Sequence, residues 1–201
     1  MSSGCCKIQT GCCVAGPPGL QGPPGTPGSS FIPLSSGPLA TPMTLIATLP
    51  TNLTAGVAMT YGDNAPIVLN DTTINATNAV DAVGMSFTAP VALSLTNLSA
   101  GFLVTAPVQL PVPVTIRADI WTSSGPTIPY TRQTAAGIPV LVLPAGAVAA
   151  GTFASVNVAL APTIAVALGT RVLVTYEAVG TAATDPIPNI IGVATAGLKY
   201  I

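Results

Sequence analysis

Hydrophobic and polar residues alternate with a period of two along much of the chain, which is the pattern of β-strands with one buried face. In residues 112–121 every second residue, beginning with Val112, is apolar, and these residues define the face expected in the core. The residues between them, such as Arg117, are expected to face away. Residues 152–160 and 171–177 show the same alternation, so each of the three segments is predicted to be a half-buried antiparallel strand.

Seven further strands complete the predicted fold, and no segment shows a convincing amphipathic helix. These strands are expected at residues 43–49, 57–61, 65–69, 83–88, 92–97, 138–143 and 190–198. Clusters of glycine, asparagine and serine at residues 61–65, 99–101 and 123–126 are predicted to form turns. About ten short strands favour an all-β fold, a β-sandwich of jelly-roll type.

Residues 16–30 form five consecutive Gly-X-Y triplets, and proline fills five of the ten X and Y positions. The glycines are Gly16, Gly19, Gly22, Gly25 and Gly28. A collagen-type triple helix leaves no room for a Cβ at its axis, so this periodicity predicts a short stalk in a trimeric molecule. A flexible Gly/Pro linker is the alternative. The chain is thereby divided into an N-terminal connector (1–15), a collagen-like stalk (16–30) and a jelly-roll head domain (31–201).

Two features of the predicted strands favour contacts between copies of the chain. The outward positions are mostly threonine, serine, asparagine and alanine, so the surface of one copy does not repel that of another. Residues 138–143 are apolar on both predicted faces, which an outer strand of a lone sandwich could not expose to water. This run is therefore a candidate for the centre of a trimer.

All four cysteines, Cys5, Cys6, Cys12 and Cys13, lie in the N-terminal connector. Their adjacent pairs do not give the Cys-x2-Cys loop that is usual for zinc, and no basic cluster supports palmitoylation. Disulfides are the leading interpretation, either between subunits or between the two pairs across the short loop. Links between subunits would clamp the free end of a stalk that is short for a triple helix.

The composition argues against enzyme activity, a metal or cofactor site and a nucleic-acid partner. Eleven of the 201 residues are charged, 5% where a soluble domain has about 25%, and histidine is absent. We therefore expect no enzyme activity and no metal or cofactor site. The basic residues are scattered singly, so no nucleic-acid partner is expected. Prolines and glycines interrupt the charge-free stretch 133–170, so a membrane span is not expected. Residues 1–7 do not lead into the apolar run of a signal peptide, so no signal peptide is expected.

Several segments together carry a resemblance to a known family. Residues 25–37, 57–65, 112–121, 171–175 and 191–197 resemble the C-terminal domain of the BclB-related collagen-like glycoproteins of the bacterial exosporium. The resemblance implies a trimeric jelly roll of the C1q and tumour-necrosis-factor kind on a collagen stalk at the spore surface. The chain departs from that family in having a stalk of only five triplets and no clear exosporium-leader motif. Its cysteine-rich connector is similar to the N-terminal connectors of endospore appendage subunits.

These observations predict a structural subunit that trimerises and then assembles head to tail into a fibre or appendage on the bacterial spore surface. Its expected partners are further copies of itself, with another cysteine-rich spore-coat or exosporium anchor protein as a candidate attachment point. The alternative function is a trimeric receptor-binding or adhesive tip of a phage or spore fibre.

Other candidate sites have simpler interpretations. Four Asn-x-Ser/Thr sequons, at Asn52, Asn70, Asn75 and Asn97, are interpreted as ordinary strand and turn chemistry. Three aspartates, Asp63, Asp71 and Asp81, lack the spacing of a calcium loop and are interpreted as solvated turns. Trp121 and Tyr130 are expected in a subunit interface, with stacking on a sugar as the alternative.

Overall fold

A computed structural model describes the greater part of the head domain. The described residues are 28, 30–38, 42–48, 55–69, 73–74, 79–125, 129–134, 137–181 and 188–201. The N-terminal connector and all of the predicted stalk except Gly28 and Ser30 lie outside them.

Strands make up nearly all of the regular structure, and one short helix interrupts them. The elements are β1 (Ser30–Ser35), β2 (Met43–Leu45), β3 (Ala47–Thr48), β4 (Gly56–Met59), β5 (Asn64–Ile67), α1 (Ala79–Met85), β6 (Phe87–Thr88), β7 (Leu93–Val104), β8 (Val108–Leu110), β9 (Val114–Ser123), β10 (Thr131–Arg132), β11 (Ile138–Leu143), β12 (Gly146–Val148), β13 (Phe153–Val166), β14 (Arg171–Gly180) and β15 (Ile190–Tyr200). In the described part of the chain no helix is long and apolar enough to cross a membrane.

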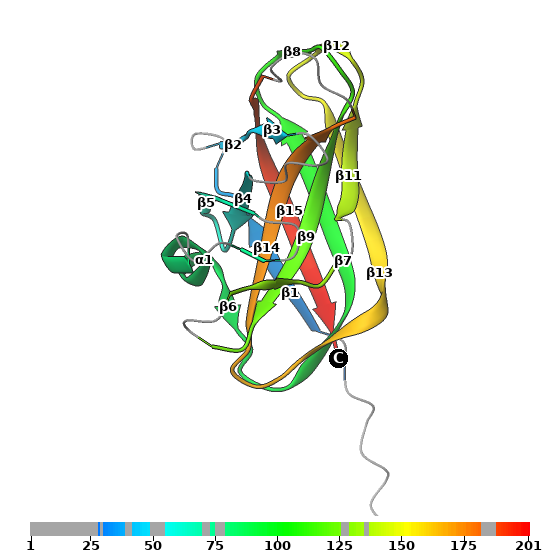
Figure 1. Ribbon diagram of the computed structural model, residues 1–201. Helices are drawn as coiled ribbons and strands as arrows, with labels where there is room; N and C mark the ends of the chain where they lie inside the picture. The colour runs from blue at the N-terminus through cyan, green and yellow to red at the C-terminus, as the bar shows by residue number, and fades with distance from the viewer. Residues whose placement is uncertain are drawn as a thin grey trace, which may run out of the picture.

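Two sheets pack face to face, so the fold is the predicted all-β sandwich (Figure 1). The first sheet has the order β1-β15-β7-β13, with β2 also paired to β15. The second has the order β10-β9-β14-β4-β5, with β11 on β9 and β3 and β6 on β14. Neighbouring strands are antiparallel, except that β3 runs parallel to β14. A small two-stranded sheet of β8 and β12 lies at one end of the sandwich.

The main core lies between the sheets and follows the predicted period of two. On β9 the residues Val114, Ile116, Ala118 and Ile120 all point into it and are fully buried. Val172, Val174 and Tyr176 on β14 meet them from the neighbouring strand. The face assignments made for these two segments are therefore confirmed.

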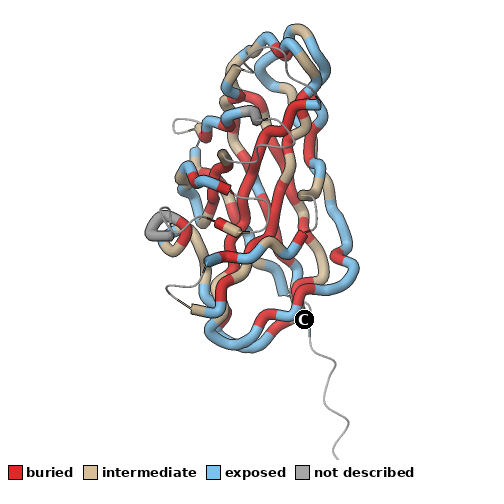
Figure 2. The backbone as a smooth tube through the Cα atoms, in the orientation of Figure 1, coloured by how far each residue is buried: buried red, intermediate tan, exposed pale blue. Residues whose placement is uncertain are grey.

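The prediction that these two strands are half-buried is wrong. Every residue of β14 after Arg171 is buried (Figure 2). On β9, the residues Asp119, Trp121 and Ser123 are also buried, although their side chains point away from the main core. A second apolar cluster explains this, because Ile74, Ala82 and Tyr130 cover Trp121 and Leu173 from outside. The sandwich thus carries an extra layer on the outer face of its second sheet.

Local expectations fail at two places. Residues 83–88, predicted as a strand, instead form the end of α1 followed by the two-residue strand β6. The turn predicted at residues 99–101 lies inside β7, where Gly101 is required by close packing: a Cβ there would lie 3.0 Å from Thr195 Oγ1 and 3.4 Å from the Phe153 ring. The turn predicted at residues 61–65 is confirmed, since Gly62 has a φ of 100° between β4 and β5.

Strand β11 has the predicted bounds, but its pairing with β9 is irregular. A register shift between Pro139 and Leu141 places two consecutive residues, Val140 and Leu141, against the core. Among the valine, leucine and isoleucine residues of this run, only Val142 is largely exposed, with an exposed fraction of 64%. The apolar character of both faces therefore has an explanation within one copy of the chain. Strand β1 was missed altogether, because Pro33 and the neighbouring serines made residues 29–42 look like a connection.

Candidate assembly surfaces

The first sheet turns an uncovered face to the outside. Its register aligns outward-pointing residues in rows across the four main strands. One row contains Pro33, Gly197, Ser99 and Asn157, and the next contains Ser35, Thr195, Gly101 and Ser155. In these four strands, which the structure describes completely, Lys199 is the one charged residue at an outward position. The residues in these two rows are therefore small, and the face as a whole is nearly uncharged.

Two phenylalanine rings stand on this face beside glycines. The Phe31 ring occupies the space that a Cβ on Gly197 would need, and the Phe153 ring lies next to Gly101. Both rings remain more than half exposed, at 57% for Phe31 and 59% for Phe153. Phe31 also forms a wall of a shallow groove whose floor includes Ser99, Gly101 and Thr195. A large, rigid apolar group exposed to this extent is typical of a contact surface.

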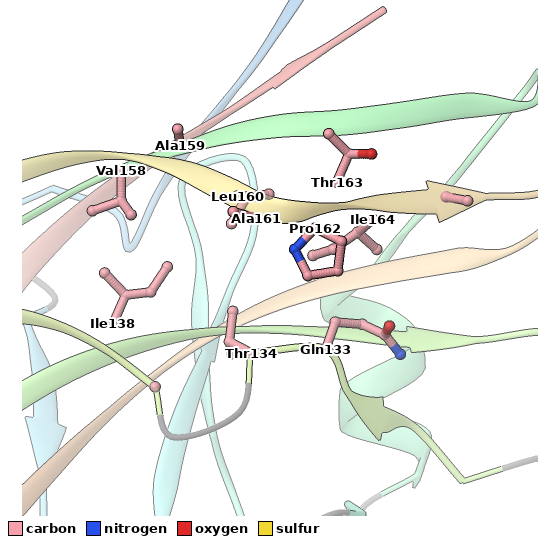
Figure 3. Close-up of a pocket in the computed structure, with 12 residues that line it drawn as sticks. Gln133, Thr134, Ile138, Val158, Ala159, Leu160, Ala161, Pro162, Thr163 and Ile164 are labelled. Atoms are coloured by element: carbon pink, nitrogen blue, oxygen red, sulfur yellow. The ribbon is translucent and has the colours of Figure 1, made fainter.

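A second groove of about 390 Å³ runs along β13, at the side where the two sheets approach each other without pairing (Figure 3). Val158, Leu160 and Pro162 line it from β13, and Ile138 and Thr134 line it from the opposite side. β13 is the last strand of its sheet, so its far edge pairs with no described strand. This groove is a second hollow, and its lining at the edge of the sandwich is partly apolar and partly polar.

The outer face of the second sheet contains a buried cluster of charges. Arg132 on β10 donates from Nη2 to Asp119 Oδ2 at 2.8 Å and to Glu177 Oε1 at 3.0 Å. The two acidic side chains are fully buried, and the arginine side chain is 6% exposed. The guanidinium lies 5.0 Å from the centre of the Trp121 ring, and Thr134 donates to Asp119 Oδ1 at 2.7 Å. One arginine thus binds two carboxyl groups in a space closed to water.

Electrostatics in this cluster favour a bound proton. Burial, and then the nearby charge of Asp119, raise the pKa of Glu177 to about 7, although Arg132 opposes the shift. Burial likewise raises the pKa of Asp119 against the attraction of Arg132 and the hydrogen bond from Thr134. Glu177 Oε2 has no hydrogen-bond partner, as expected for two acids that share one cation. The cluster joins β10 to β9 and β14 through buried charges.

Trp121 lies on β9 beneath the extra layer and Tyr130 lies in that layer, so the expectation that they form a subunit interface is wrong, as is the sugar-stacking alternative. Trp121 is fully buried and its indole Nε1 donates to Thr175 Oγ1 at 2.9 Å. The Tyr130 hydroxyl donates to Ser86 Oγ at 2.8 Å, and the residue is 2% exposed. Both rings hold the extra layer of their own chain against the sheet.

The cysteines and most of the predicted stalk fall outside the described residues. Cys5, Cys6, Cys12 and Cys13, and Gly16, Gly19, Gly22 and Gly25, are in this group. Gly28 is described, and it is exposed with nothing within 4 Å of the place of a Cβ. Within the described residues there is no group of three or more His, Cys, Asp or Glu side chains placed to hold a metal ion.

Of the other candidates, Asp63 lies exposed in the β4-β5 turn, where Asp63 Oδ1 accepts a hydrogen bond from the Asn64 backbone N–H at 2.8 Å. Asn97 is a half-buried residue on β7, and Asn52, Asn70, Asn75 and Asp71 are outside the described residues. Sequence reasoning missed the Asp119–Arg132–Glu177 cluster. The available signal was the placement of Asp119 and Glu177 inside strands of a chain that has so few charges.

Comparisons with known proteins give little further information. No protein-family model matches the chain, and no curated protein matches it. A solved structure of infectious bursal disease virus, strain Gx, is similar over 86% of this chain, with 11% sequence identity and a TM-score of 0.42. The chain spans 31% of the length of that viral chain. The comparisons therefore place the chain in no family, and the established identity is that of an antiparallel β-sandwich.

Proposed function

We propose that the chain is a structural subunit that trimerises through a collagen-like stalk and a jelly-roll head of the C1q and tumour-necrosis-factor kind. The trimers assemble head to tail into a fibre or appendage on the bacterial spore surface. The observation that carries the proposal is the strict Gly-X-Y run, whose last triplet begins at Gly28 and reaches Ser30, the first residue of β1. A triple helix joined so directly to a folded domain requires three heads side by side.

The structure of the head supports a role in assembly. Its first sheet has an uncovered face with two exposed phenylalanine rings and one charged residue, which suits contact with a neutral neighbour. Three charged groups on the other sheet, Asp119, Arg132 and Glu177, are buried within the chain itself. The four clustered cysteines are placed to link copies at the other end of the stalk.

The runner-up function is a receptor-binding or adhesive tip, for which the groove along β13 would be the candidate ligand site. The two functions predict different behaviour of the purified protein. A fibre subunit forms polymers that electron microscopy can detect, whereas a tip forms trimers with saturable binding to a ligand and no polymer.

The first test is the native mass of the reduced full-length chain. We expect three times the 19.8 kDa of one chain, and a lone monomer at micromolar concentration would exclude the proposal. The second test removes residues 1–15. The head-to-tail arrangement requires that polymers disappear and that trimeric heads remain, so polymers that persist without the connector would contradict that arrangement.

A further inference from the structure

We infer that the outer face of the β1-β15-β7-β13 sheet is the surface on which the head packs against two further copies of the chain, facing the three-fold axis. The inference rests on the proposed trimer and specifies which surface of the head is used. It differs from the sequence-based expectation that β11 lies at the trimer centre.

Chain connectivity supplies the first argument. The Gly-X-Y glycines end at Gly28, and two residues of extended chain reach about 7 Å. Ser30, the first residue of β1, is therefore held close to the axis that the three stalk chains share. Ser30 pairs with Tyr200 on β15, and Ser94 on β7 exchanges backbone hydrogen bonds with Ile201. One end of the first sheet thus lies near the axis, whereas the second sheet is joined to β1 at its other end, where Ser35 exchanges backbone hydrogen bonds with Thr60 and Gly62.

The second argument is that the extra layer covers the outer face of the second sheet, whereas the outer face of the first sheet is uncovered. On the second sheet, Trp121, Thr175 and Glu177 are buried under the extra layer. On the first sheet, Phe31, Thr195 and Ser155 are exposed, and no described element lies over them. The sheet held near the axis is therefore the one whose face is free to meet another subunit.

The third argument is the chemistry of the face. Small polar side chains at Ser99, Ser155 and Asn157 let a neighbouring surface approach closely. The Phe31 ring, over Gly197, and the Phe153 ring, beside Gly101, provide raised apolar features. No carboxylate lies at an outward position of these four strands. Lys199 lies in the row of Phe31, next to the end of the sheet, where a long side chain can extend its ammonium group into water. Three copies of this face can pack together without burying like charges.

Radical footprinting of the reduced, soluble, full-length protein tests the inference. Phe31 and Phe153 are 57% and 59% exposed in one copy, and Val142, on β11 of the second sheet, is a control with a similar exposed fraction of 64%. After correction for the intrinsic reactivity of each side chain, we expect Phe31 and Phe153 to oxidise several-fold more slowly than Val142.

A matched pair of variants completes the test. Thr195→Glu places a carboxylate on the proposed interface, whereas Thr88→Glu places one at an exposed position of β6 opposite Arg171. We expect Thr195→Glu to remove the protection of both phenylalanines even when the stalk still joins the chains, and Thr88→Glu to leave it unchanged. Circular dichroism verifies folding, and Ser155→Glu replaces Thr195→Glu if that variant does not fold.

The outcomes separate the inference from the proposed function. A trimeric protein in which Phe31 and Phe153 react as readily as Val142 overturns the inference and leaves the trimer intact. A trimer in which both phenylalanines stay protected in the folded face variant, Thr195→Glu or its replacement Ser155→Glu, also overturns it. A monomeric wild-type protein rejects the proposed function, and the inference with it.

Discussion

The hydroxyl of Tyr176 on β14 donates to the backbone carbonyl of Thr195 on β15, 2.7 Å away and on the opposite sheet of the sandwich. The carbonyl of Gly101, the residue paired with Thr195 on β7, lies 3.3 Å from the same hydroxyl. Burial raises the pKa of Tyr176, so the hydroxyl keeps its proton at all ordinary pH values. One side chain thus links the covered sheet to the back of the open face.

Replacing Tyr176 by phenylalanine tests this link. The substitution removes a buried hydrogen bond and keeps the ring that contacts Phe102, so we expect the free energy of unfolding to fall by about 1–2 kcal/mol. Urea unfolding measures the change. Tyr61→Phe is the control, because Tyr61 is mostly exposed, and equal stability of the two variants would show that the link contributes nothing.

The buried charge cluster predicts an unusual dependence of stability on pH. The pKa of Glu177 is about 7 in the folded protein, above the 4.5 of an unperturbed glutamate, so the folded state binds the proton more tightly than the unfolded state. Stability is therefore highest below pH 4.5 and is lost as the pH rises towards 7. From the size of the shift, the loss is on the order of 3 kcal/mol.

Glu177→Gln keeps the shape of the side chain and carries no charge at any pH. We expect this variant to lose most of the decline in unfolding free energy between pH 4.5 and 7.5, because the titrating group is gone. Asp63→Asn, which removes an exposed carboxyl, is the control and should retain the wild-type slope. Parallel curves for wild type and Glu177→Gln would mean that Glu177 is ionised throughout.

Two glycine substitutions are expected to change the stability of the folded protein in opposite directions. A Cβ on Gly192 in β15 would lie 2.5 Å from the Leu103 carbonyl oxygen and even closer to the Phe102 ring, so Gly192→Ala should cost about 3 kcal/mol. Gly84 lies in α1 with open space around its Cβ position, so Gly84→Ala should stabilise the protein by about 0.5–1 kcal/mol. Thermal melts of the two variants check both signs. A neutral Gly192→Ala would mean that β7 and β15 can separate at no cost.

The cysteine connector predicts that assemblies resist detergent until their thiols are reduced. In the proposed assembly apolar contacts hold the trimers, and disulfides formed by Cys5, Cys6, Cys12 and Cys13 would open only by exchange or reduction. Replacing all four by serine should make assemblies dissociate in detergent without a reductant, as seen by gel electrophoresis of unheated samples. Full resistance in the serine variant would exclude covalent joining.

Much of the fold could be predicted from the alternation of side chains, since β9, β11, β13, β14 and β15 lie where their patterns placed them. The pattern could not predict what covers the outer face of a strand, because Asp119 and Trp121 alternate with core residues whether they meet water or an extra layer. It also misread Gly101 as a turn, since a glycine needed for close packing and one needed for a reversal look alike in sequence. The uncovered face of the first sheet required knowledge of β1, whose Pro33 hid the strand.

The inward placement of Asp119, Arg132 and Glu177 has a consequence for the behaviour of the molecule in solution. The chain has only eleven charged residues, and these three are withdrawn from the ions of the medium. Dissolved salt acts by screening exposed charges, and here few are left to screen. We therefore expect a molecule whose melting temperature and degree of association hardly change between dilute buffer and physiological ionic strength.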